Sequence, residues 1–181
     1  MLNPSPPPAE GPSLHDTPTG PSGPVEPSLL LLLGGAIFVA CVLGTLSRPL
    51  NMLASFWCAN AIMLGMMVRS RPLGRSGWAW GVAALAYVSS ALLMGDAPLK
   101  AVWLSASNLA GVLVGWLYFQ HVPRRAALLG DQLSPLYLLL GCLAAAAVAA
   151  LVAFLMGPVM FGSSAMGTLV MWFTSEFMNY M

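Results

Sequence analysis

Residues 50–68 constrain this chain most, because they carry no charged side chain and are followed at once by three arginines. Nineteen residues rise about 28 Å as a helix at about 1.5 Å each, close to the bilayer hydrocarbon thickness of about 30 Å. The stretch is therefore long enough to cross a membrane. Arg69, Arg71 and Arg75 follow it, and the positive-inside rule places them on the cytoplasmic side.

The composition agrees with a membrane protein. Of 181 residues, 58% are hydrophobic and only 7% are charged, far below the usual quarter. Seven Lys and Arg against six Asp and Glu leave no basic surplus, so we expect the lipid bilayer as a partner and not nucleic acid. Cys41, Cys58 and Cys142 lie in apolar runs without metal-ligand spacing, and we interpret them as small buried hydrophobes. We expect no metal and no cofactor.

Six apolar runs predict the architecture. We expect spans at 28–46, 50–68, 77–95, 101–120 and 135–157, and a last one that begins at residue 168. If the N-terminus is cytoplasmic, the inner loops hold five arginines, whereas the outer loops hold one arginine and one lysine. The predicted fold class is all-α, a polytopic transmembrane helix bundle in the cell inner membrane.

The two ends of the chain differ from these spans. Residues 1–27 contain nine prolines and predict a disordered Pro-rich tail, which is either a true extension or an over-extended start-site assignment. The last run has only fourteen residues, whereas about 20 are needed to cross. It is either a short buried helix or a truncated span, and we favour truncation because a charged terminus at mid-membrane is costly. Residues 28–181 then form a membrane domain that is incomplete at its C-terminus.

Strong polar residues fall at one depth in three of the spans. Asn60, Asn108 and Glu176 lie about seven to ten residues into spans that all run from outside to inside, which places them some 10 to 15 Å below the outer surface. An ionisable group at that depth is a functional-site hypothesis. Two interpretations stay open: these residues and Ser175 bind a ligand or act as a switch, or they only hold helices together.

Small residues predict where helices approach closely. Gly111 and Gly115 form a G-x-x-x-G pattern within the fourth span, which allows the backbone of another helix to come near. We expect helix packing at this seam and no ligand site.

Several short sequence motifs of this chain resemble those of a known family. Trp57-Cys-Ala-Asn60, the arginine turn, Trp78 to Gly81, Asn108 followed by Gly-x-x-x-Gly-Trp, and Trp172-Phe-Thr-Ser175-Glu176 are similar to the first bacterial membrane-associated sensor domain family, the MASE domains. The resemblance covers residues 28–181. The chain departs from it at Cys58 and Ala61, where the family often has Pro and Gly.

The resemblance implies a sensory and anchoring input domain. Such domains have about eight spans and precede cytoplasmic output modules such as diguanylate cyclases or histidine kinases. It implies candidate sensing or helix-coupling roles for Trp57, Asn60, Asn108, Trp172, Ser175 and Glu176, an unknown small ligand, and homodimerisation through the output modules.

Two other functions stay open. The chain contains no nucleophile beside a base and no phosphate-binding glycine loop, so we expect no catalysis by this chain itself. A subunit or fragment of a small-solute transporter would use the same polar layer as a substrate path. A purely structural anchor would use it for packing alone.

Overall fold

The computed structural model describes residues 25–47, 57–155 and 165–181, and within these ranges every regular element is a helix. The long helices are α1 (Pro27–Leu46), α4 (Gly77–Leu93), α5 (Pro98–His121) and α7 (Ser134–Phe154). Shorter ones are α2 (Ala59–Arg69), α3 (Arg71–Arg75), α6 (Arg124–Ala127) and α9 (Ala165–Tyr180). The predicted all-α fold class is confirmed.

Three helices, α1, α5 and α7, are long and apolar enough to cross a membrane. Helices α2 and α4 are shorter apolar helices, so the predicted count of six spans is not confirmed among the described residues. Large apolar side chains such as Leu31, Leu85 and Leu93 point outward with at least 69% of their surface exposed. An outward apolar surface of this kind fits a protein that lies in a lipid bilayer.

Local sequence explains most helix boundaries. Helices α1, α5 and α7 each have a proline in their first turn, where the missing N–H costs nothing. Helix α4 ends before Gly95, whose φ of +88° gives the left-handed turn that closes a helix. The last helix begins at Ala165, three residues before the predicted start at Thr168.

Some predictions fall outside the described residues. The Pro-rich tail falls there as far as residue 24, and so do residues 48–56, which include the first part of the predicted second span. The described part of that span is α2. Of the predicted outer loop at 158–167, only its last three residues are described, and they belong to α9.

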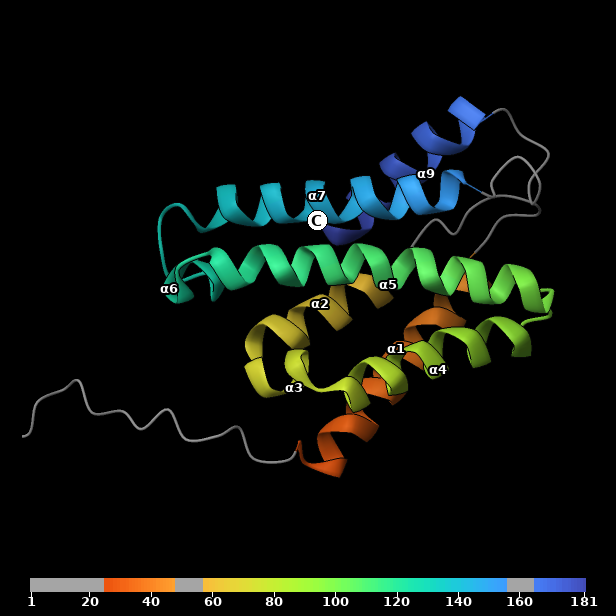
Figure 1. Ribbon diagram of the computed structural model, residues 1–181, viewed down its shortest axis with the longest axis horizontal. Helices are drawn as coiled ribbons and strands as arrows, with labels where there is room; N and C mark the ends of the chain where they lie inside the picture. The colour runs from red at the N-terminus through yellow and green to blue at the C-terminus, as the bar shows by residue number, and fades with distance from the viewer. Residues whose placement is uncertain (1–24, 48–56, 156–164) are drawn as a thin grey trace, which may run out of the picture.

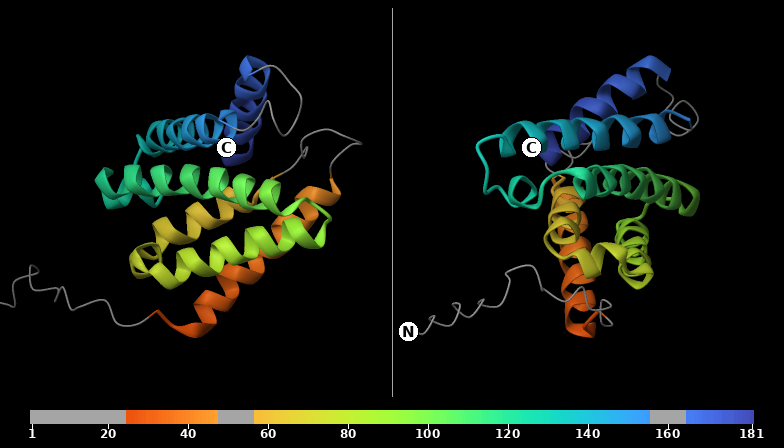
Figure 2. Two further views of the ribbon diagram at one scale, coloured as in Figure 1. Left: turned by 45° about the vertical axis from the view of Figure 1, so that its right-hand side comes forward. Right: turned by 60° about the vertical axis from the view of Figure 1, so that its left-hand side comes forward.

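Helix α5 lies in the middle of the bundle. It packs against α7 on one side and against α2 and α4 on the other, while α1 packs on α4 and α2 (Figure 1). Helix α9 crosses α7 at an angle and also reaches α2, as both further views show (Figure 2). This arrangement brings α2, α4, α5 and α9 together around one region.

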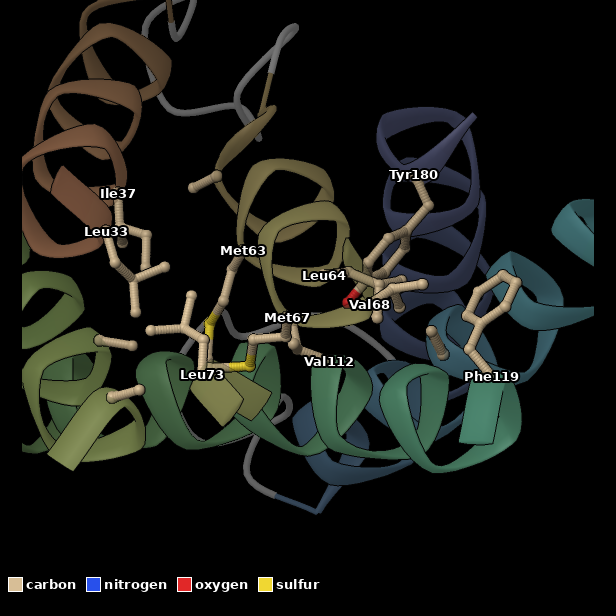
Figure 3. Close-up of a cluster of buried hydrophobic side chains, with 14 of the residues drawn as sticks. Leu33, Ile37, Met63, Leu64, Met67, Val68, Leu73, Val112, Phe119 and Tyr180 are labelled. Atoms are coloured by element: carbon tan, nitrogen blue, oxygen red, sulfur yellow. The ribbon is translucent and has the colours of Figure 1, made fainter. Parts of the chain in front are cut away.

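The apolar core lies where α1, α2 and α5 meet. Met63 and Met67 of α2 point toward Leu73 and Val112, and each of the four side chains is fully buried (Figure 3). Unbranched methionines fill irregular spaces between helices. These four side chains therefore pack helices α2, α3 and α5 together.

The predicted glycine seam lies at the contact between α5 and α7. A methyl group added at Gly111 would lie 2.9 Å from the carbonyl oxygen of Ala145 and 3.0 Å from the Cβ of Ala149. One added at Gly115 would lie 3.0 Å from the side chain of Leu64. Both glycines serve close packing, as the G-x-x-x-G pattern predicted.

Candidate functional site

Asn60 is the hub of a buried polar cluster. Its side-chain nitrogen donates to Oδ1 of Asn108 at 3.2 Å and to Oε2 of Glu176 at 2.7 Å. Its side-chain oxygen accepts from the hydroxyl of Tyr87 at 2.6 Å. All four side chains are at most 5% exposed. The three residues that the sequence places at one depth are therefore joined through Asn60, which links α2 to α4, α5 and α9.

The sequence reasoning missed Tyr87. A tyrosine in the middle of an apolar helix needs a partner for its hydroxyl, because burying that group without one is costly. Tyr87 lies ten residues after Gly77 in α4, at the middle of a predicted span. That position could have indicated a buried hydroxyl group in need of a partner. The sequence could not identify the partner, because Asn60 lies 27 residues away in the chain.

The sequence reasoning also missed Asn179. Its side-chain oxygen accepts from the backbone N–H of Trp57 at 2.9 Å, just before α2 begins. Its side-chain nitrogen donates to the hydroxyl of Ser175 at 3.4 Å. Asn179 therefore attaches the last helix to the start of α2, one turn beyond Glu176.

A cavity of about 50 Å³ opens above the cluster. A single water needs about 10–15 Å³ measured in this way, so the cavity has room for about four waters or a ligand of similar size. Five of the six predicted site residues line it, and Asn60 lies behind them. The lining residues are Thr45, Trp57, Tyr87, Ser90, Ala91, Asp96, Ala101, Leu104, Ser105, Asn108, Trp172, Ser175 and Glu176.

The cavity also shows how the helices run. Its lining contains the end of α1, Trp57 two residues before α2, the second half of α4 and the first half of α5. At the opposite end, the guanidinium of Arg124 donates to the carbonyl oxygens of Val68 and Arg69, both at 2.6 Å. The ends of α2 and α5 therefore meet there. These contacts agree with the alternating directions predicted for the spans.

A second cavity lies at the end of the bundle where Arg124 is. It measures about 260 Å³ and is lined mostly by apolar side chains, with Arg69 and Tyr180 as its polar members. Although it is larger, few polar groups converge on it. Ligand sites combine an apolar wall with a small number of convergent polar groups, and only the first cavity has both.

The described residues contain no group of three or more His, Cys, Asp or Glu that could hold a metal ion. Within this part of the chain the three cysteines form no disulfide. The first cavity is lined by carboxyl, amide and hydroxyl groups, which can make hydrogen bonds to a solute.

Searches of protein-family models, of curated proteins and of solved structures give no match to this chain. The resemblance to membrane-associated sensor domains consequently stays an expectation from the residues quoted for it.

Proposed function

We propose that this chain is the membrane-embedded input domain of a bacterial signal-transduction protein, which detects a small solute and anchors a cytoplasmic output module. The observation that supports it is the convergence of the predicted residues on one cavity. Glu176 and Asn108 line it together with the indoles of Trp57 and Trp172. The output module would be a diguanylate cyclase or a histidine kinase, with homodimerisation through that module.

The cluster offers a route from the cavity to the last helix. Glu176 and Asn179 lie on α9, and they hold Asn60 and Trp57 at the start of α2. A solute that binds Glu176 contacts the same carboxyl group that Asn60 holds through Oε2. Binding would therefore favour one placement of α9 against α2 over another, which is what a ligand must do to shift an equilibrium.

The substitution Glu176→Gln, made in the full-length protein in its own host cell, tests this function. The variant keeps the shape of the side chain and removes its charge, so we expect output to stay at one level whether or not the stimulus is present. Protein abundance and membrane insertion should stay normal, and the exposed carboxyl group removed in Asp131→Asn should leave the response unchanged. A normal response in Glu176→Gln would show that Glu176 only holds helices together, as in a structural anchor.

The proposal includes an orientation in the cell inner membrane with a cytoplasmic N-terminus. In a variant without native cysteines, Ser76→Cys in the short turn between α3 and α4 should be unreachable by an impermeant thiol reagent in intact cells. Ser163→Cys, outside the described residues, should be labelled. The reverse pattern would overturn the orientation.

A small-solute transporter is the second candidate, and the second cavity favours it. Glu176 lines the first cavity and Tyr180 lines the second, only four residues apart on α9, or about 6 Å along a helix. Two vestibules separated by one turn would suit alternating access. This function predicts solute flux by the purified chain in sealed vesicles, and an input domain predicts none.

A further inference from the structure

We infer that the cavity above Asn108 and Glu176 binds a small organic ammonium ion. This inference rests on the proposed function, because it names the chemical class of the solute that the cavity receives.

The charges of the lining have one sign. Asp96 and Glu176 both line the cavity, and among the described residues no lysine, arginine or histidine does. The ammonium group of Lys100 bonds to Asp96 at 2.8 Å, which offsets the charge of that acid at the mouth. For Glu176, the lining contains no cation. A cationic ligand complements this arrangement, and an anion is repelled by it.

Three hydroxyl groups of the wall already donate their hydrogens within the protein. Tyr87 donates to Asn60 at 2.6 Å, and Ser90 donates to the carbonyl oxygen of Tyr87 at 2.9 Å. Ser105 donates to the carbonyl oxygen of Ala101 at 2.7 Å. What these three oxygens still offer to a ligand is lone pairs. The wall is therefore rich in acceptors, and its ligand should be a donor.

The carboxyl group of Glu176 is a further hydrogen-bond acceptor in the lining. Oε2 of Glu176 accepts from Asn60, and Oε1 has no hydrogen-bond partner among the described residues. Glu176 is 5% exposed and lines the cavity, so Oε1 is the carboxyl oxygen available to a bound group. The lining also contains neutral donors: the amide of Asn108, the hydroxyls of Thr45 and Ser175, and the indole N–H groups of Trp57 and Trp172. None of these would compensate the charge of an anion as a cation compensates that of Glu176.

Two indole rings and the cavity volume indicate which kind of cation the cavity would bind. Trp57 and Trp172 both line the cavity, and indole faces attract ammonium groups more strongly than other aromatic rings do. A volume of about 50 Å³, room for about four waters, suits an ammonium ion with a few carbon atoms. Carboxylate, acceptor-rich wall and indole rings together favour an alkylammonium over a metal cation.

A cysteine in the cavity tests the sign of charge directly. Ser105→Cys, in a variant without native cysteines, is reacted in lipid nanodiscs with two methanethiosulfonates, one bearing an aminoethyl and one a sulfonatoethyl group. Rates are divided by those at the exposed position of Gln132→Cys, which removes the intrinsic reactivity of each reagent. We expect the cationic reagent to react at least about tenfold faster, because charges a few ångströms apart in a protein interact by more than 1.4 kcal/mol.

Three comparisons decide the result. Methylammonium should slow the labelling of Ser105→Cys, whereas methanol, a neutral molecule of similar size, should not. Glu176→Gln should remove the preference for the cationic reagent, and Asp131→Asn should keep it. The protection by methylammonium needs no change at Glu176, so it tests the inference even if Glu176→Gln does not fold.

The outcomes separate the two proposals. Equal rates for both reagents, or protection by methanol as good as by methylammonium, would overturn the ammonium inference while leaving a solute-accessible cavity. If neither reagent reaches Ser105→Cys while Gln132→Cys is labelled, solutes do not enter, and the proposed receptor function fails with it.

Discussion

The hydrogen bonds of Asn60 predict a graded loss of stability. Asn60 makes three bonds to other helices, whereas the Tyr87 hydroxyl makes one of these three. Interhelical hydrogen bonds in membrane proteins contribute about 0.6 kcal/mol each. We therefore expect Asn60→Leu to lower the free energy of unfolding by about 2 kcal/mol and Tyr87→Phe by about 0.6 kcal/mol, with the two substitutions keeping similar side-chain volumes.

The double variant tests whether both losses come from the same bond. Because Asn60→Leu already removes the acceptor of Tyr87, the double variant should be no less stable than Asn60→Leu alone, within about 0.3 kcal/mol. Stability is measured by reversible unfolding of the purified chain in mixed micelles of increasing dodecyl sulfate content, followed by helicity. Tyr118→Phe is the matched control, because Tyr118 lies on α5 outside the cluster.

Three results would refute this reasoning. One is a Tyr87→Phe variant as stable as the parent, another is a double variant with fully additive losses, and the third is an equal loss in Tyr118→Phe. Any of these would mean that the short distances around Asn60 do not reflect bonds that hold the helices together.

Two further predictions concern packing and the basic end of the bundle. Gly111→Ala should lower the free energy of unfolding by about 1–3 kcal/mol in the same unfolding assay, because its methyl group meets a carbonyl oxygen at 2.9 Å. Gly65→Ala is the control and should not lower it, because nothing lies within 4 Å of the added methyl group. Arg124→Ala should speed hydrogen exchange at the end of α2 and cost about 1 kcal/mol, because it removes two bonds to the last carbonyl groups of that helix. Arg125→Ala should change neither quantity, since Arg125 is exposed.

The positions of most helices follow from the sequence alone. The runs predicted at 28–46, 77–95 and 135–157 correspond closely to α1, α4 and α7. Apolar length, proline and glycine act locally along the chain, so these boundaries need no knowledge of the neighbours. Short helices such as α3 were not predicted, because a five-residue helix has no periodicity of its own.

The depth of the polar residues also follows from the sequence. Each residue of a helix advances by a fixed rise, so counting from the ends of spans with the same direction places Asn60, Asn108 and Glu176 in one layer. The structure joins them through the side-chain nitrogen of Asn60. Their role in sensing stays a prediction.

Only the tertiary structure decided which side chains meet around that layer. Tyr87 points at Asn60, Asn179 holds the start of α2, and Arg124 binds its end. Each contact depends on how a helix is rotated about its own axis. Helices that are apolar on nearly every face carry little periodic signal for that rotation. It is set by packing between segments distant in the chain, such as the contact of α5 with α7 at Gly111.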